Sequence, residues 1–264
     1  MVFADAEVQV SIAPTARIEN SRIETKGDSK LILDDGVIIR DTLIVLRDSH
    51  LHISRGTILD GVNMFAEQNS SISIGQNSEI IKYDYMLYSA RFASNEECHF
   101  VQGRNALRPY FNIAEGDVHI GDHNVIRADF WVRFGGHVHI GQYNCINERT
   151  EIRCDESVAI GCFNMISYDC SIWDTNTHCQ YDIETRRVKT KNDFPIIGKE
   201  TERPKTKPIV IGDDCWVGKY ATLLKGTILN NQVIIGVRTL ISNREIPRGA
   251  KVVSAYSQVV YAVK

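Results

Sequence analysis

The chain contains no long apolar run, no marked excess of charge of one sign and only 6 prolines among 264 residues. No apolar stretch approaches the roughly 18 residues that a membrane-spanning helix needs, so we expect no integral membrane segment. The formal net charge of -3 argues against a protein whose whole surface binds nucleic acid. The first ten residues, MVFADAEVQV, lack a basic start and a long apolar core, and so do not indicate a secretory signal.

Cysteine is also sparse, and its arrangement excludes a simple disulfide framework. The chain has 7 cysteines, an odd number, and no CxxC pair. Cys170 and Cys215 occupy positions of the apolar repeat described next, so we expect both to be small buried hydrophobic residues. These features favour a reducing, cytoplasmic setting.

A strict period of six is the most informative pattern in the chain. Between residues 211 and 246 an aliphatic side chain recurs at every sixth position: Ile211, Val217, Leu223, Leu229, Ile235 and Ile241. Four places after each of the first five stands a small or β-branched residue: Cys215, Ala221, Thr227, Val233 and Thr239. Neither a helix nor a simple strand has this period. Hexapeptide repetition indicates a parallel β-helix, in which one apolar side chain per short strand points inward.

The same pattern extends towards the N-terminus in units of about 20 residues. VHIG at 118–121, VHIG at 138–141 and VAIG at 158–161 begin three such units. The expected inward positions are Ile120/Ile126/Val132, Ile140/Ile146/Ile152 and Ile160/Ile166/Ile172, preceded by Leu33/Ile39/Val45, Ile53/Leu59/Phe65 and Ile74/Ile80. Residues 11–21 are expected to form a first, capping coil. We therefore predict an all-β fold, with residues 1–264 forming one solenoid of triangular coils of about 18–20 residues.

Two segments interrupt the repeat. Residues 81–117 lack it and include the aromatic residues Tyr83, Tyr85, Tyr88 and Phe92. Residues 179–208 form a polar insertion, with eight Lys/Arg against four acidic residues between Glu184 and Pro208. Insertions in a solenoid leave the prism as loops, and such loops often carry function, although simple solubility also explains the charge.

Stacking of coils places residues about 20 apart in sequence about 4.8 Å apart in space. We expect Asp129, Arg149 and Asp169 to form a column of alternating charge. Arg133 and Arg153 are expected to stack as like charges, which requires a neighbouring acid such as Asp155, or an anionic ligand.

His178 stands where the repeat ends. After Ile160, Ile166 and Ile172 the next inward position is 178, which holds a histidine directly before the long insertion. An unperturbed imidazole has a pKa of about 6.5 and can take a proton from a hydroxyl group as a general base. A purely structural histidine is the alternative. Asp174 and Asn176 are both close enough in sequence to orient the ring, and the sequence does not choose between them.

Residues 118–260 resemble the hexapeptide-repeat acyltransferases, in particular the maltose/galactoside and cell-surface-polysaccharide O-acetyltransferases. The segments that carry the resemblance are IGCFNMISYDCSIWDTNTH at 160–178, KPIVIGDDCWVGKYATLLKGTIL at 207–229 and the Ile246-Pro247 turn. The resemblance implies a left-handed parallel β-helix, a homotrimer with active sites between subunits, acetyl-CoA bound along the coils as acyl donor, and a carbohydrate acceptor.

The resemblance also assigns roles to individual residues. His178 matches the family's catalytic base, and Asn147 matches the asparagine that helps to hold the acceptor. Trp216, Gly218, Ala221 and Gly236 match the wall along the pantetheine arm. The chain departs from the family where a basic residue often meets the nucleotide phosphates, because Gln258 stands there. Contact with the phosphates then falls to the remaining basic candidates, which are Arg244, Arg238 and the 179–208 insertion.

These observations predict an acetyl-CoA-dependent O-acetyltransferase acting on a sugar hydroxyl, by direct transfer and without a metal. An N-acetyltransferase for an amino sugar is the nearest alternative, since the fold serves both reactions. A γ-class carbonic anhydrase would use three histidines, but His119, His123 and His139 lack that class's spacing. A non-catalytic scaffold is the third alternative. The aromatic residues of 81–117 could stack on a sugar or pack against the prism.

Overall fold

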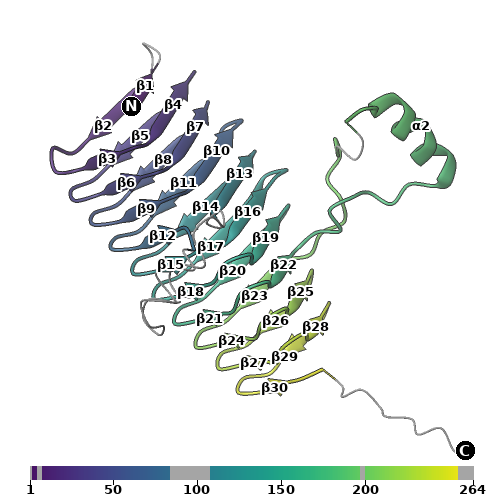
Figure 1. The fold of residues 1–264 in the computed structure, drawn as a ribbon. Coiled ribbons are helices and arrows are strands. Elements are labelled where there is room, and N and C mark those ends of the chain that lie inside the picture. The colour runs from purple at the N-terminus through teal and green to yellow at the C-terminus, as the bar shows by residue number, and fades with distance from the viewer. Residues whose placement is uncertain (1, 5–7, 84–107, 197–199, 255–264) are drawn as a thin grey trace, which may run out of the picture.

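The computed structural model describes residues 2–4, 8–83, 108–196 and 200–254, and in this part the chain winds through three parallel sheets (Figure 1). Successive strands enter successive sheets, so every turn of the chain adds one strand to each sheet. The predicted parallel β-helix is confirmed. Its left-handed winding stays a prediction.

Sheet A contains the longest strands of the N-terminal coils, several of them five residues long. Its strands are β1 (Val2–Ala4), β4 (Arg22–Lys26), β7 (Leu43–Arg47), β10 (Asn63–Glu67), β13 (Tyr110–Ala114), β16 (Asp129–Val132), β19 (Glu151–Cys154), β22 (Ser171–Trp173), β25 (Thr222–Leu224) and β28 (Leu240–Ile241). The turns that lead from sheet A to sheet B form what we call the A–B edge.

Sheet B follows sheet A in every coil. Its strands are β2 (Gln9–Ile12), β5 (Lys30–Leu33), β8 (His50–Ile53), β11 (Ser71–Ile74), β14 (Gly116–Ile120), β17 (Gly136–Ile140), β20 (Ser157–Ile160), β23 (Ile209–Ile211), β26 (Ile228–Leu229) and β29 (Glu245–Ile246). The turns that lead on to sheet C form the B–C edge.

Sheet C closes the prism, mostly with strands of two or three residues. They are β3 (Arg17–Glu19), β6 (Ile38–Arg40), β9 (Ile58–Asp60), β12 (Glu79–Ile81), β15 (Val125–Ile126), β18 (Cys145–Ile146), β21 (Met165–Ile166), β24 (Trp216–Val217), β27 (Ile234–Ile235) and β30 (Lys251–Val252). The turns from sheet C back to sheet A form the C–A edge.

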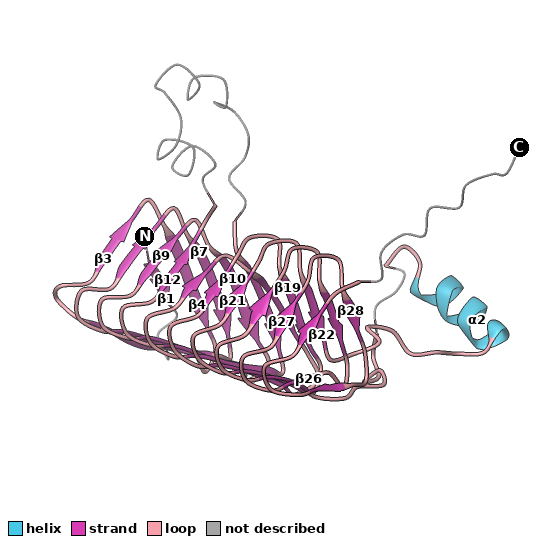
Figure 2. Cartoon of the chain, turned by 90° about the horizontal axis from the view of Figure 1, so that it is seen from below, coloured by secondary structure: helices cyan, strands magenta, loops and turns pink. Residues whose placement is uncertain are grey.

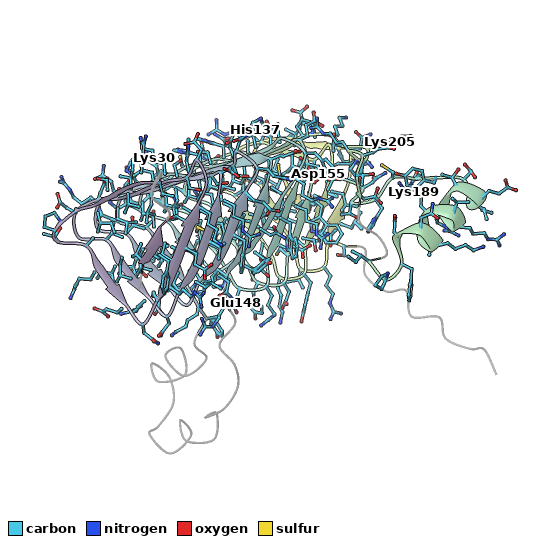
Figure 3. All side chains as sticks on the ribbon, turned by 90° about the horizontal axis from the view of Figure 1, so that it is seen from above. Lys30, His137, Glu148, Asp155, Lys189 and Lys205 are labelled. Atoms are coloured by element: carbon cyan, nitrogen blue, oxygen red, sulfur yellow. The ribbon has the colours of Figure 1, made fainter. Side chains whose placement is uncertain are left out.

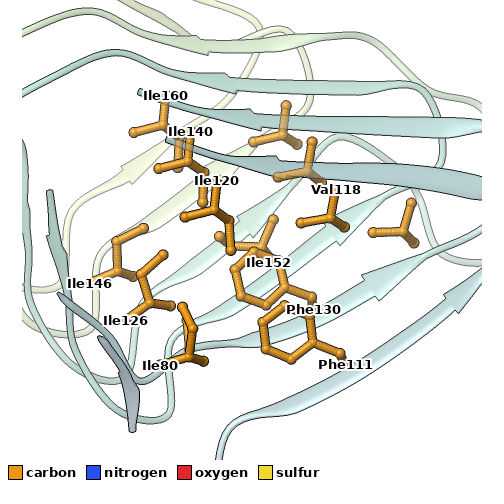
Figure 4. Packing of buried hydrophobic residues seen from close by; sticks show 14 of the residues in the cluster. Ile80, Phe111, Val118, Ile120, Ile126, Phe130, Ile140, Ile146, Ile152 and Ile160 are labelled. Atoms are coloured by element: carbon orange, nitrogen blue, oxygen red, sulfur yellow. The ribbon is translucent and has the colours of Figure 1, made fainter. Parts of the chain in front are cut away.

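The core is a continuous apolar column inside the prism, because alternate side chains of each short strand point inward. Apart from position 178, every inward position predicted between residues 118 and 241 is buried, as are the small residues four places further on. Phe111 and Phe130 stack in this column with ring centroids 4.5 Å apart (Figure 4). The six-residue period therefore identified the core of the coils from β14 to β28.

The predicted inward positions Val45 and Phe65 are wrong. Each lies on the outer face of sheet A and is only partly buried, while Ile44 and Met64 point inward. The five-residue strands β7 and β10 direct two side chains each into the core, and this shifts the ladder by one residue. A one-residue shift exchanges the two faces of a strand.

The first interruption is shorter than predicted. Strand β13 begins at Tyr110 and pairs in register with β10, so the solenoid has already resumed before residue 117. Tyr85, Tyr88 and Phe92 lie outside the described residues. At the other end, the first coil begins with β1 at Val2, before the segment 11–21 that was expected to cap the solenoid.

The second interruption is a loop with a helix, α2 (Ile183–Asp193), which projects from the A–B edge (Figures 1 and 2). Its N-cap residue Asp182 accepts a hydrogen bond from the backbone N–H of Thr185 at 2.9 Å. No residue of α2 is buried, and Lys189 lies well away from the prism (Figure 3). No helix in the described part of the chain is long and apolar enough to cross a membrane.

The predicted charge column is only half present. Arg149 forms a bidentate pair with Asp169, with Nε–Oδ1 and Nη2–Oδ2 distances of 2.5 and 2.8 Å. Asp129, however, stacks on Glu151, because register in sheet A advances by 22 residues at this coil. The same shift places Asp155, not Arg153, beside Arg133.

Candidate active site

A short two-stranded stem carries the inserted loop at the A–B edge. Thr175 and Thr206 form an antiparallel bridge. The backbone N–H of Asn176 donates to the carbonyl of Lys205 at 3.0 Å, and that of Lys207 to Asp174 at 2.9 Å. This pairing folds the end of the loop back against its beginning, and so brings residue 200 opposite residue 178.

His178 is exposed on this stem and is held by a carboxylate from the far side of the insertion. Its Nδ1 lies 2.9 Å from Oε1 of Glu200. The His178 side chain is 61% exposed, whereas that of Glu200 is only 7% exposed. A nearly buried carboxylate thus anchors one nitrogen of an accessible imidazole. Sequence analysis missed Glu200, because no spacing rule links it to His178.

The prediction that Asp174 or Asn176 orients His178 is wrong. Asp174 is fully buried, and its carboxylate accepts hydrogen bonds from the backbone N–H groups of Asp155, Glu156 and Ser157 at 2.7–2.9 Å. Burial raises the pKa of Asp174, while these N–H groups oppose the shift. Asn176 accepts from the ammonium group of Lys225. Asp174 therefore secures the turn between β19 and β20 and does not reach the imidazole.

The residue before His178 has an unusual backbone conformation. Thr177 has φ of +63°, which is a genuine outlier for a β-branched residue. Its N–H donates to Oγ1 of Thr175 at 3.0 Å, and its carbonyl accepts from Nη2 of Arg133 at 3.3 Å. Strain of this kind persists only where surrounding contacts hold it, and here it turns His178 out of the apolar ladder.

Arg133 is fixed in turn by a buried acid. Its guanidinium makes bidentate contacts of 3.0 and 2.9 Å with Asp155, which is 1% exposed. Asp155 also accepts from Oγ1 of Thr175 at 2.7 Å. The expectation that an acid compensates Arg133 is confirmed. Asp155, Arg133 and Thr175 form a connected network beneath the backbone that carries His178.

A cavity of about 460 Å³ lies near the N-terminal coils, and one of about 640 Å³ adjoins His178. The second is within the range of small-molecule sites. It runs along sheet A and the A–B edge, and the residues that matter below are Glu67, Asn112, Glu115, Trp131, Arg153 and His178. The candidate base therefore opens onto a space large enough for a ligand.

Trp131 and Arg153, which line this cavity, belong to a column of aromatic and guanidinium groups on the outer face of sheet A. Tyr110 packs on Phe65 and on Trp131, with centroid distances of 5.7 and 5.2 Å. The guanidinium of Arg153 lies between Trp131 and Trp173, 5.5 and 5.0 Å from their ring centroids. Arg153 also pairs with Glu151 at 2.5 Å. The charge of the column is therefore already compensated.

Asn147 lies away from His178 in the chain. It follows β18 at the C–A edge, whereas His178 is at the A–B edge. Its Oδ1 accepts from Nη1 of Arg127 at 3.0 Å, and its Nδ2 donates to the carbonyl of Ile166 at 3.2 Å. A single chain does not bring these two predicted residues together.

The residues expected to form the pantetheine wall share the C-terminal coils but differ in exposure. Trp216 on sheet C is 56% exposed, whereas Ala221 is fully buried and offers its methyl group only to the core. A Cβ atom on Gly218 would lie 2.9 Å from the carbonyl oxygen of Ile235 in the next coil, and one on Gly236 would lie 3.2 Å from that of Val252. The close stacking of coils thus explains both glycines without a ligand.

The two arginines expected near the phosphates lie at different edges. Arg238 is at the C–A edge, with its guanidinium 5.4 Å from the ring centroid of Tyr220. Arg244 is exposed at the A–B edge, in the turn between β28 and β29. Lys207 and Lys225 lie at the same edge and bond to the amide oxygens of Asn243 and Asn176. Among the described residues, none of these three A–B cations pairs with a carboxylate.

The histidines considered for a metal site lie on sheet B and at the B–C edge. His119 and His139 stack with centroids 4.9 Å apart, and burial together with the neighbouring His139 lowers the pKa of His119. His123 stacks on Tyr143. Within the described ranges, no group of three or more His, Cys, Asp or Glu side chains is placed to hold a metal ion.

Comparison with protein-family models and with curated protein sequences finds no match to this chain. Two solved structures have a backbone arrangement similar to that of this chain. The polySia-specific acetyltransferase NeuO shares 14% identity at a TM-score of 0.44, over 95% of this chain and 84% of that one. The polysialic acid O-acetyltransferase OatWY shares 13% at a TM-score of 0.36, over 96% and 85%.

Proposed function

We propose that the protein is an acetyl-CoA-dependent O-acetyltransferase that transfers an acetyl group to a sugar hydroxyl of a surface glycan or its precursor. The observation that carries the proposal is the exposed imidazole of His178, anchored at Nδ1 by Glu200 and opening onto a cavity. This arrangement supplies a general base next to space for a ligand, and direct acyl transfer requires both.

Glu200 fixes the tautomer of His178. An ionised carboxylate only accepts hydrogen bonds, so Nδ1 of a neutral imidazole must carry the proton when it contacts Glu200. The lone pair then resides on Nε2, which is the nitrogen left free of Glu200. In the proposed reaction Nε2 takes the proton of the acceptor hydroxyl as its oxygen attacks the thioester carbonyl. The carbon–sulfur bond breaks, the acetyl group stays on the acceptor oxygen, and coenzyme A leaves as a thiolate that takes up the proton held on Nε2.

The A–B edge on the C-terminal side of His178 suits the phosphates of the donor. Lys207, Lys225 and Arg244 offer three cations there without described carboxylate partners. Phosphate oxygens are strong acceptors for such groups. We therefore assign the phosphate contact to these residues in preference to Arg238, which stacks on Tyr220 at another edge.

A homotrimer with sites between subunits is part of the proposal. Trp216 and Asn147 lie towards sheet C and the C–A edge, so they could approach His178 only from a neighbouring chain. Phe163, Met165 and Trp216 are 56–62% exposed, which provides apolar surface for such a contact. The described cysteines are free thiols, in keeping with the proposed reducing, cytoplasmic setting.

The proposal is tested by incubating the purified protein with acetyl-CoA and a panel of glycans and nucleotide sugars. We expect release of free coenzyme A thiol that depends on the acceptor, and a product whose acetyl group mild base or hydroxylamine removes. A base-stable amide would indicate N-acetylation instead. Absence of both acetyl-CoA binding and thiol release would overturn the assignment, and light scattering would test the trimer by its mass.

A further inference from the structure

The cavity beside His178 is elongated along the solenoid axis. In sheet A, Glu67 stands in register with Ala114, and Asn112 with Trp131 and then Arg153. Residues of all these coils line the same cavity as His178. Four steps separate the coil of Glu67 from that of the His178 stem, or about 19 Å at about 4.8 Å a step. This length exceeds that of a single sugar ring.

The cavity is acidic. Glu67, Glu115 and Glu200 line it; Glu200 contacts His178, and neither Glu67 nor Glu115 pairs with a cation among the described residues. The two guanidiniums that also line it are already neutralised, Arg133 by Asp155 and Arg153 by Glu151. A ligand that carries carboxylates would therefore meet uncompensated negative charge.

The remaining polar groups suit a polyhydroxyl compound. Gln68 and Asn112 line the cavity and make no side-chain hydrogen bond in the part of the chain that is described. A carboxylate accepts hydrogen bonds from hydroxyl groups, and a side-chain amide both donates and accepts. Neutral sugars offer hydroxyl donors in every ring, and so satisfy Glu67, Glu115 and both amides without adding charge.

The charge along the A–B edge thus changes from negative to positive at His178. Towards the C-terminus it presents Lys207, Lys225 and Arg244, and towards the N-terminus it presents Glu67 and Glu115. An anionic donor and a second anionic substrate would compete for the same cations. A neutral substrate on the acidic side avoids this competition.

We infer that the acceptor is an uncharged oligosaccharide of several sugar units, lying along the solenoid axis between Glu67 and His178 against the aromatic column of sheet A. This inference rests on the proposed function and specifies its acceptor. Glycans with a carboxylate on each sugar are disfavoured by Glu67 and Glu115.

Binding in the absence of acetyl-CoA tests the inference. The full-length protein is titrated with neutral oligosaccharides, from monosaccharide to pentasaccharide, and with carboxylated chains of equal length, followed by saturation-transfer NMR and calorimetry. We expect affinity to rise with length, and neutral chains to bind more tightly than carboxylated ones at low ionic strength. Added salt should reduce the difference, because it screens exposed charges.

Paired variants identify the residues responsible. In the double variant Glu67→Gln, Glu115→Gln the preference for neutral chains should shrink about 3- to 10-fold. The control double variant Glu19→Gln, Glu79→Gln makes the same charge change at exposed positions of sheet C and should leave the preference unchanged.

Equal affinity for carboxylated and neutral chains, equal affinity for monosaccharide and pentasaccharide, or binding of no glycan would each overturn the inference. If acetyl-CoA still binds and thiol is still released with some other acceptor, the inferred acceptor class is wrong while the proposed acetyltransferase activity stands. If acetyl-CoA neither binds nor reacts, the proposed function itself fails.

Discussion

Nδ1 of His178 lies 2.9 Å from Oε1 of Glu200, a residue that the inserted loop returns to the A–B edge. The insertion therefore does more than interrupt the solenoid. Its stem carries the candidate base on one strand and the carboxylate that orients it on the other, so the two residues depend on each other for their geometry.

Glu200→Gln should lower kcat about 10- to 100-fold, because an amide holds the imidazole in one tautomer less strictly than a carboxylate. The KM for acetyl-CoA should change little, and Glu200→Asp should restore part of the rate. Glu202→Gln, on the same stem, is the matched control. Steady-state kinetics on the three variants checks this, and equal rates for Glu200→Gln and Glu202→Gln would remove Glu200 from the mechanism.

Arg133→Lys should reduce kcat about tenfold without altering the affinity for acetyl-CoA, since a lysine lacks the planar guanidinium fork that holds Asp155 bidentately while it contacts the carbonyl of Thr177. Arg149→Lys is the control, because Arg149 also forms a bidentate pair, with Asp169, but at the C–A edge. Both variants should lose some thermal stability. A rate loss of the same size in Arg149→Lys would show that Arg133 acts on stability alone.

Arg244→Gln and Lys225→Gln should each raise the KM for acetyl-CoA several-fold, by about 3- to 30-fold for loss of one charge-assisted contact, while kcat and the KM for the acceptor stay near their original values. Arg238→Gln tests the other edge. If Arg238→Gln alone raises the KM for the donor, the phosphates lie at the C–A edge.

Asp129→Asn should stabilise the protein at neutral pH. Burial raises the pKa of Asp129 to about 6, opposed by the N–H of Tyr110 and assisted by Glu151. The folded state therefore keeps its proton up to about pH 6, whereas the unfolded chain releases it near pH 4. The stability that this group contributes is present below pH 4 and is lost as the pH rises through 6. The Asp129→Asn variant should therefore be more stable than the parent protein at pH 7.5 and equally stable at pH 4.

Thermal unfolding at the two pH values measures this difference. Asp169→Asn is the opposite case, because Arg149 lowers the pKa of Asp169. Loss of the Asp169 carboxylate should destabilise the protein at pH 7.5. The difference in stability should become smaller at low pH, where Asp169 of the parent protein is itself protonated. Identical pH dependence in the two variants would contradict the assignment.

The sequence predicted the solenoid well because each inward position is decided by one local requirement, an apolar side chain at a fixed interval. The prediction failed at Val45 and Phe65, where longer strands move the interval by one residue. It also failed to see β13, since Tyr110–Ala114 resumes the coil after a long interruption and is recognisable only by its pairing with β10.

The candidate site was harder to predict than the fold, because its contacts join distant parts of the chain. His178 was identified by the end of the ladder, but Glu200 meets it only through the pairing of the stem. Asp174 looked like a partner in sequence, yet its carboxylate accepts hydrogen bonds from the N–H groups at the turn between β19 and β20, one coil earlier. Helix α2 has an N-cap residue, Asp182, but no periodic apolar residues, because none of its side chains is buried. Its sequence therefore lacks the pattern that usually predicts a helix.

The central claim is that His178 is the general base of acyl transfer, and the most direct measurement is single-turnover acetylation by His178→Ala beside the parent protein. The account predicts a rate lower by roughly 10² to 10⁴, with the dissociation constant of acetyl-CoA and the melting temperature nearly unchanged. A His178→Ala protein that acetylates its acceptor at close to the parental rate would contradict it.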